Sequence, residues 1–508
     1  MSRNVKKRSA KALSRVAGVH DQNRALAHVD ELLAAKPDTL GEEASQWLSA
    51  WLKVMERPFL WNLPPIGVSY EPRQKVTKEL KEIIEKNYYQ GLFDAAIATV
   101  AEEKIPELKK IKTLDQYYYY VDSLATWIPG IRHWDMYGES YHERTPYLRI
   151  TQFYYYFNQP ELESIQSPID PVKGKDLSPI SKWLRDFAVS WGDFLDTEKS
   201  ARHLESFKYA PEYDWQQFQH PPQDYKTFNS FFARQFQDIA VQRPVAQPDN
   251  DRVIVFPAES TFVTQCAITV PVGEPLPAKS SIVVKHIEWP IHELLADSEY
   301  AENFEGGLLV HSFLNTYDYH RQHTPMGGKV IEAKFIPGQV YLEVNLKDVD
   351  PEEIHGELAR TVIPQRLLDA EDPTGYQFVQ CRGLIVLQTP IGKVAILPMG
   401  MAQVSSVVFA SKQSDGTYKP IELTADEKKN MTYDQQVEKV NEMVQKEMVG
   451  KHLEKGEMFS FFQFGGSDCV VIFERQACVD ISAKVDVHYP LRSQYGISNI
   501  KELLPVPK

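Results

Sequence analysis

The sequence has little of what marks secreted, membrane-spanning or nucleic-acid-binding proteins. Its 508 residues include four cysteines, Cys266, Cys381, Cys469 and Cys478, whose scattered spacing fits neither a disulfide framework nor a zinc knuckle. No apolar run approaches the length of a membrane span. The formal net charge of -13 argues against nucleic acid as the main partner and against simple electrostatic docking on anionic membranes. We therefore expect reduced thiols, no metal site and a cytoplasmic location.

The first residues differ from the rest because they carry only basic charges. Six of the first twenty residues are lysine or arginine and none is acidic. Two interpretations stay open for residues 1–25, a solvated basic tail and a mitochondrial transit peptide.

Helical patterns dominate residues 26–175, which we predict to form an N-terminal helical domain. Apolar residues at helical spacing predict one long helix from Pro72 to about Glu103. Two aromatic runs, Tyr117–Tyr120 and Phe153–Phe157, fit either packing between helices or a ligand-contacting belt, and packing is favoured because tyrosine bodies bury well. A segment rich in proline, serine and acidic residues, Pro160–Leu177, indicates the domain boundary.

We predict a second domain over residues 176–508. From Val253 onward it consists of short β-rich runs separated by turns, as in a largely antiparallel domain. One exception is Thr424–Val449, where a capping box of Thr424 and Glu427 predicts a polar, exposed helix. Near the C-terminus, Val470–Phe473 is typical of a buried strand. The predicted fold class is therefore α+β, with a helical N-terminal region followed by a β-rich domain.

Candidate catalytic groups lie in three separate segments of the β-rich part. Ser467 follows Gly465 and Gly466, two residues that leave the backbone bare. His320 and His323 lie between Asn315 and Pro325, a pattern that suits a short helix and would place both imidazoles on one face. Zinc binding is an alternative for this pair, although no third ligand is evident nearby. Glu259 follows a predicted strand, and serine, histidine and carboxylate are the parts of a nucleophile, its base and the group that orients the base.

Several segments, in the same order, resemble the phosphatidylserine decarboxylase family of self-processing, pyruvoyl-dependent enzymes. They are Phe228-Asn229-Ser230-Phe231-Phe232 with Arg234, Arg243-Pro244-Val245, Pro257-Ala258-Glu259, Asp318-Tyr319-His320-Arg321 with His323, Pro337-Gly338 with Val344-Asn345, Gly400 with Ala402, and Gly465-Gly466-Ser467. Two positions depart from the family pattern: Asp468 stands where threonine is usual, and Glu259 where aspartate is usual. The N-terminal helical region resembles the extension of fungal decarboxylase-like proteins, a branch that includes the tryptophan decarboxylase of psilocybin formation.

The resemblance implies a role for each candidate residue. His323, oriented by Glu259, would activate Ser467 for attack on the Gly466 carbonyl, so that the chain cuts itself between Gly466 and Ser467. Ser467 would become a pyruvoyl group, which forms a Schiff base with a substrate amine and replaces pyridoxal phosphate. His320 would deliver the proton during decarboxylation. The large and small chains would stay associated, and a homodimer is left open.

Three functions follow from this resemblance. The first is decarboxylation of a free amino acid, with an aromatic one and L-tryptophan foremost, since the chain is acidic and lacks an apolar span. The second is decarboxylation of phosphatidylserine to phosphatidylethanolamine. The third is a scaffold that no longer processes itself, for which Asp468 and Glu259 are the supporting features, whereas the retained Ser467 and both histidines oppose it.

Overall fold

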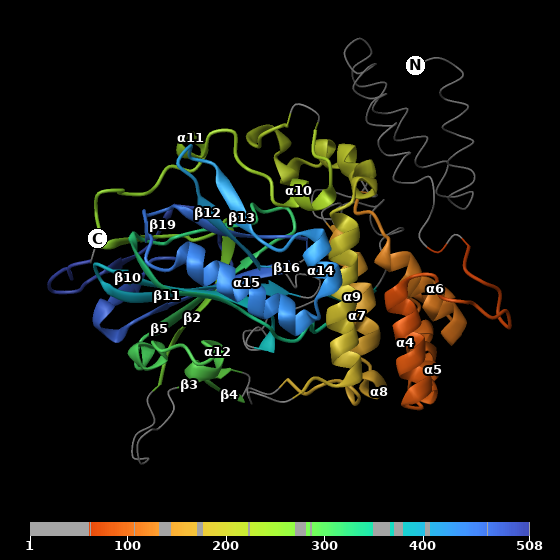
Figure 1. Ribbon diagram of the computed structural model, residues 1–508. Helices are drawn as coiled ribbons and strands as arrows, with labels where there is room; N and C mark the ends of the chain where they lie inside the picture. The colour runs from red at the N-terminus through yellow and green to blue at the C-terminus, as the bar shows by residue number, and fades with distance from the viewer. Residues whose placement is uncertain are drawn as a thin grey trace, which may run out of the picture.

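A helical part and a sheet part lie side by side in the computed structural model (Figure 1). The structure describes residues 60, 62–105, 107–131, 144–169, 176–221, 224–269, 281–284, 287–348, 366–369, 379–401, 407–464 and 466–506. The predicted basic tail, residues 1–25, lies outside them. The described elements confirm the α+β class, with helices first and antiparallel strands after them.

The helical part is a bundle of helices held together by aromatic side chains. Its α-helices are α4 (Lys75–Lys86), α5 (Gln90–Glu102), α6 (Leu114–Ala125), α7 (Arg144–Phe157), α8 (Pro160–Glu163) and α9 (Pro179–Leu195). The 3-10 helices that accompany them are η1 (Leu108–Lys110), η2 (Glu198–Tyr209), η3 (Pro211–Tyr213) and η4 (Trp215–Gln217). The single helix predicted over Pro72–Glu103 is wrong, because the chain breaks between α4 and α5. Tyr88 has a φ of 59°, a left-handed conformation that a helix interior does not accommodate.

Both aromatic runs pack between helices, as favoured from the sequence. The rings of Tyr117 and Tyr156 meet edge to face with centroids 4.9 Å apart, and those of Phe153 and Phe187 stack at 4.5 Å. Helix α9 joins this bundle although it follows the predicted boundary at 175/176, since the Trp183 indole N–H donates to the Val76 carbonyl at 2.7 Å. The boundary itself stays a prediction.

The sheet part is built on one eight-stranded sheet in which every neighbouring pair is antiparallel. Its spatial order is β14 (His452–Leu453), β7 (Gly328–Ile336), β10 (Arg382–Thr389), β11 (Gly392–Met401), β16 (Gly466–Phe473), β5 (Leu308–Leu314), β2 (Ser260–Ala267) and β18 (His488–Tyr489). Strand β16 lies inside this sheet, hydrogen-bonded to β11 on one side and β5 on the other. The predicted strand Val470–Phe473 is confirmed, and all four of its side chains are buried.

Smaller sheets surround this one. A four-stranded sheet has the order β13 (Tyr418–Ile421), β12 (Val407–Lys412), β15 (Met458–Phe462) and β6 (Arg321–His323). A three-stranded sheet has the order β1 (Val253–Val255), β19 (Gln494–Ser498) and β17 (Val479–Ile481). Two-stranded sheets pair β3 (Ser281–Val284) with β4 (Ile287–Pro290) and β8 (Asn345–Asp348) with β9 (Arg366–Asp369).

Further helices lie before and between these strands. They are α10 (Phe228–Phe232), α11 (Ile239–Gln242), α12 (Ile291–Leu294), η5 (Ala301–Phe304), α14 (Ala425–Asn430), α15 (Tyr433–Met448) and η7 (Arg475–Ala477). The predicted capping box of Thr424 and Glu427 is present, but it opens only the short helix α14. A second capping box at Thr432 starts α15, which packs on β7 and buries Val444 and Met448. The expected single exposed helix is therefore two helices, the longer of which covers the sheet (Figure 1).

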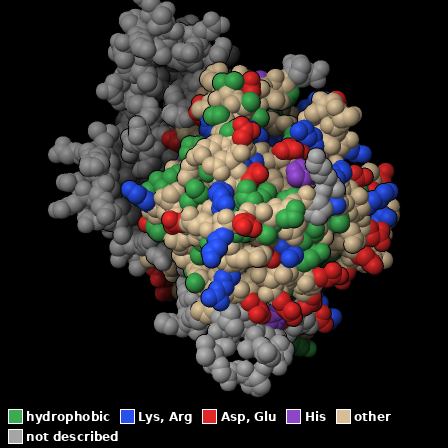
Figure 2. Space-filling model, turned by 90° about the vertical axis from the view of Figure 1, so that its left-hand side faces the viewer, with side chains coloured by type: hydrophobic (Ala, Val, Ile, Leu, Met, Phe, Trp, Pro, Cys, Tyr) green, Lys and Arg blue, Asp and Glu red, His purple; other side chains and the backbone are tan. Residues whose placement is uncertain are grey.

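Within the described ranges, no helix combines the length and apolarity that crossing a bilayer requires. On the face shown in Figure 2, lysine, arginine and acidic side chains of the described residues are interspersed.

Candidate active site at the β15–β16 junction

Ser467 lies at the start of strand β16, and the structure describes its backbone there. Its backbone pairs with Gly400 of β11 and with Leu314 of β5, and Gly466 pairs with Met401. Gly465 lies outside the described residues. The peptide bond that joins Gly466 to Ser467 is thus positioned by two neighbouring strands, one of which presents a glycine directly opposite Ser467.

His320 and His323 do not lie on a helix, so the predicted helical turn is wrong. Strand β6 spans Arg321–His323 and pairs with β15, placing Met458 opposite His323 and Phe461 opposite Arg321. Side chains alternate between the two faces of a strand, so residues three apart do not share a face as they would on a helix. The two imidazoles consequently occupy different surroundings.

His323 is buried and held in one tautomer. Its Nδ1 lies 2.8 Å from the Gly456 carbonyl oxygen, which only accepts, so Nδ1 carries the hydrogen and Nε2 keeps its lone pair. The Tyr319 hydroxyl lies 3.3 Å from Nε2 and can donate to it. Burial, with the nearby positive charge of Arg492, lowers the pKa of His323 well below its usual value. The side chain is therefore a neutral imidazole whose Nε2 lone pair is available to accept a proton.

Arg492 fixes the carbonyl that orients His323. Its Nε and Nη2 donate to the Gly456 carbonyl at 2.9 and 2.6 Å. Gly456 has a φ of 75°, which suits glycine, and an added Cβ would lie 2.8 Å from Val245 and 3.1 Å from Arg492 Nε. Neither residue belongs to the candidate site predicted from the sequence, because no local pattern around Gly456 or Arg492 indicates contact with a histidine.

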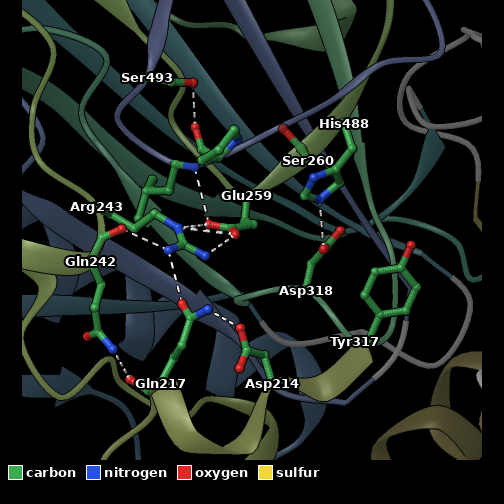
Figure 3. A network of polar contacts seen from close by, with 12 residues as sticks. Asp214, Gln217, Gln242, Arg243, Glu259, Ser260, Tyr317, Asp318, His488 and Ser493 are labelled. Atoms are coloured by element: carbon green, nitrogen blue, oxygen red, sulfur yellow. Dashed lines mark hydrogen bonds and ion pairs between the residues drawn. The ribbon is translucent and has the colours of Figure 1, made fainter. Parts of the chain in front are cut away.

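The backbone next to Glu259 contacts the backbone of His323, but the Glu259 carboxylate binds Arg243 and not the imidazole. The His323 N–H donates to the Pro257 carbonyl at 2.8 Å. The carboxylate of Glu259 accepts from Arg243 Nη2 at 2.5 Å and Nε at 2.8 Å, and from the Leu491 N–H at 3.2 Å (Figure 3). Among the described residues, Glu259 makes no hydrogen bond to His323, and the Gly456 carbonyl occupies the place expected for a carboxylate. The structure therefore connects the two residues through the adjacent Leu491 and Arg492 rather than directly.

A second acid–histidine pair lies beside this network. The His488 Nε2 is 2.9 Å from Asp318 Oδ1, two residues before His320 in the sequence (Figure 3). Burial alone would lower the pKa of His488, and the hydrogen bond to Asp318 outweighs it and raises the pKa. Neither residue was singled out for this pairing from the sequence, because their separation of 170 residues hides it.

His320 contacts the end of strand β15 that leads into the glycine–serine junction, whereas His323 lies opposite Met458 at the start of β15. The His320 ring stacks on Phe232 at 3.8 Å, and Phe232 meets Phe464 edge to face at 5.4 Å. Its carbonyl accepts from the Phe462 N–H at 2.9 Å, five residues before Ser467. The imidazole is fully buried, and among the described residues its hydrogen-bond contact comes from the backbone of Asp318 and not from another side chain. Burial, and then Arg234, lower its pKa well below the usual value.

The site offers these histidines rather than a metal centre. In the ranges that the structure describes, no three metal-ligating side chains converge. The arrangement can activate a hydroxyl at one neutral imidazole and move a proton at the other. The roles of Ser467, His323, Glu259 and His320 stay predictions.

Comparison with known proteins gives one consistent result. Residues 228–492 match the model of a family described as phosphatidylserine decarboxylase. Phosphatidylserine decarboxylase proenzyme 3 of Schizosaccharomyces pombe is 26% identical over 297 residues, which are 58% of this chain and 24% of that protein. The phosphatidylserine decarboxylase proenzyme of Fusobacterium nucleatum is 25% identical over 296 residues, which are 58% of this chain and 76% of that protein.

A third relative comes from another fungus. Decarboxylase iboD of Amanita muscaria is 25% identical over 313 residues, which cover 57% of this chain and 75% of that protein. The chain spans about a quarter of the length of the S. pombe relative. The matched segment contains the Glu259 and His323 segments and the Gly465-Gly466-Ser467 junction, and it extends over half of the sequence. The chain therefore belongs to the phosphatidylserine decarboxylase family.

Proposed function

We propose that the chain is a carboxy-lyase that makes a pyruvoyl group from its own Ser467 and uses it to decarboxylate an amino acid. The observation that carries the proposal is the neutral, buried His323, whose Nε2 lone pair is left available by the Nδ1–H bond to Gly456. It belongs to the family segment that also contains Ser467.

Self-cleavage needs a base, a nucleophile and an orienting group. His323 accepts the Ser467 hydroxyl proton, and the oxygen attacks the Gly466 carbonyl carbon while the peptide C–N bond breaks and the nitrogen takes up the proton. The resulting ester eliminates, which leaves a carboxylate on Gly466 and a dehydroalanine at position 467. Water then hydrolyses the imine tautomer of that residue, releasing ammonia and leaving the ketone. Arg492 and Gly456 hold the base in position.

The residues around position 467 fit such a group. Among the described residues, no side chain hydrogen-bonds to the buried His320 ring, as expected of a group that acts on a substrate. A pyruvoyl group, once formed, supplies an electron-withdrawing carbonyl that bonds the substrate amine and stabilises the electrons left behind by carbon dioxide. His320, neutral at ordinary pH, holds a hydrogen on one nitrogen and a lone pair on the other. It is our candidate for delivering the proton that replaces the carboxylate.

The substrate proposed first is a free amino acid, with aromatic ones and L-tryptophan foremost. The net charge of -13 opposes attraction to anionic lipid surfaces, and the N-terminal helical extension resembles that of amine-forming fungal members. The second candidate is phosphatidylserine, which is favoured by the names of the S. pombe and F. nucleatum relatives.

Electrophoresis and intact mass of the purified protein test the proposal. We expect two chains, residues 1–466 and 467–508, and one uncut chain in Ser467→Ala. His323→Ala should stay uncut, whereas His320→Ala should be cut but inactive. An uncut wild-type chain with an ordinary serine would contradict the proposal and favour a scaffold. Carbon dioxide release from L-tryptophan, other amino acids and phosphatidylserine vesicles then separates the two substrates.

A further inference from the structure

A cavity lies between the helical part and the sheet, beside the glycine–serine junction. Its volume is about 150 Å³, and its walls come from α9, from β12 and β13, and from α14 and α15. Figure 1 shows α9 next to α14 and α15, where the two parts of the molecule meet. The cavity is thus a partly open pocket formed jointly by the helical part and the sheet part.

The cavity reaches the chain just before Ser467. Phe464 and Gln463 line it just before the junction. Phe464 is three residues before Ser467, so their Cα atoms are at most roughly 11 Å apart. Val407, which also lines the cavity, pairs with Phe462, while β11 pairs with Gly466 through Met401. A group bound at position 467 is therefore within reach of this wall.

The lining is that of a site for an apolar ring. Phe335, Val407, Ile421, Val437, Val440 and Phe464 contribute its apolar surface. Cavities of roughly 150 Å³ in apolar surroundings take up benzene. The ionisable side chains on the cavity are Asp193, Glu422 and Lys428, and burial raises the pKa of both carboxyl groups.

We propose that this cavity, hereafter the α9–α15 cavity, receives the aromatic side chain of the amino-acid substrate while the α-amine lies at position 467. The inference rests on the proposed function and adds the substrate class and a role for the helical extension. Helix α9 supplies one wall, so the extension selects the substrate rather than only stabilising the fold.

Gly192 of α9 offers a way to fill the cavity without a clash. It lines the cavity, and a Cβ added there would meet no atom within 4 Å. Gly192→Phe should therefore occupy the space meant for a substrate ring, and Gly192→Ala should have a smaller effect. Val437→Phe fills it from the opposite wall on α15. Gly91→Phe on α5, also open around its Cβ, is the matched control outside the cavity.

The first measurement needs no self-cleavage. Indole should raise the melting temperature of the uncut Ser467→Ala chain and of its Gly91→Phe derivative, by mass action on the folded state. Adding Gly192→Phe or Val437→Phe should abolish this rise. Stabilisation by indole that persists in both filled variants, or that is absent from the Ser467→Ala chain, overturns the inference.

The second measurement uses the processed enzyme. Gly192→Phe should be cut like wild type, and its kcat/KM for L-tryptophan and L-phenylalanine should fall about tenfold or more while that for L-alanine is retained. Equal losses for all three substrates, or turnover of phosphatidylserine vesicles alone, overturn the inference. Failure of the proposed function gives a different result, an uncut wild-type chain or no carbon dioxide, and the indole measurement still decides whether the cavity binds a ring.

Discussion

His311 and Asp468 form a buried acid–histidine pair across strands β5 and β16, with His311 Nε2 3.2 Å from Asp468 Oδ1. Both side chains are fully buried in the sheet. Asp468 is the residue after Ser467 and stands where threonine is usual in the family, so the departure from the family pattern is accompanied by a basic partner on the neighbouring strand. The pair would hold the first residues of the small chain against the large chain after cleavage.

Removing one member of this pair should destabilise the protein. His311→Leu removes the imidazole that faces the buried Asp468 carboxyl group, and the loss of such a partner from a buried polar group typically costs about 1–3 kcal/mol. Denaturant unfolding in a Ser467→Ala background, where the chain is uncut, measures the loss. His311→Leu combined with Asp468→Val should cost less than the sum of the single changes, because each single change already removes the contact that the two side chains share. Strictly additive losses would show that the two residues do not interact.

Gly456 should control self-cleavage through its carbonyl. Gly456→Ala places a methyl against Val245 and Arg492 and should displace the carbonyl that orients His323. We expect cleavage to slow about tenfold or more, since misplacing a catalytic group by roughly 1 Å can cost 10²-fold. Gly450→Ala is the control, because Gly450 also has a positive φ of 88° but open space around its Cβ. Time courses by electrophoresis should show slow cleavage only in Gly456→Ala, and equal rates in both variants would refute the role of the carbonyl.

Glu259 should act on His323 indirectly. Glu259→Gln and Arg243→Gln each break the same ion pair, and each should lower stability by about 1.5–3 kcal/mol and slow cleavage. Their double variant should be little worse than either single change. Unfolding midpoints and cleavage rates measure both effects. If Glu259→Gln blocked cleavage completely while Arg243→Gln did not, a direct contact with His323 during the reaction would be required.

The Asp318–His488 pair should make stability depend on pH. The hydrogen bond raises the pKa of His488 above 6.5, so its stabilising contribution is complete below pH 6.5 and is lost as pH rises through the raised value. Burial raises the pKa of Asp318, which also favours protonation in the folded state and gives the same sign. The melting temperature of wild type minus that of His488→Asn should therefore shrink from pH 6 to pH 9. Asp318→Asn should remove the same dependence, and a pH-independent difference would contradict the prediction.

The strands and the class of the fold were predictable because they depend on local apolar patterns. Val470–Phe473 is apolar without interruption, and it is buried on both faces as such a run requires. The segment around Asn315 misled the prediction because its local chemistry is shared by turns and helix starts. The Asp318 carboxylate does accept from the Asn315 N–H at 2.8 Å, but the pairing of β6 with the distant strand β15 decides the conformation.

The sequence allows the candidate site residues to be identified, but it does not indicate which groups they contact. Gly-Gly-Ser, the two histidines and Glu259 are recognisable as short segments in a fixed order. The partner of His323 is a backbone carbonyl 133 residues away, and any residue can supply a carbonyl. The partner of Glu259 was within the quoted Arg243-Pro244-Val245 segment, yet only the folded chain shows that its guanidinium binds the carboxylate.

The strands after Ser467 are interleaved with those before it. Strand β16 lies between β11 and β5, β18 borders β2, and β19 lies between β1 and β17. A cut ahead of residue 467 would therefore produce a short peptide whose strands lie within the sheets of the longer chain. We expect this arrangement to form by folding of the uncut chain. Heat inactivation of the cut protein should then be irreversible, and its half-life should depend on the rate of unfolding and not on the equilibrium free energy of unfolding.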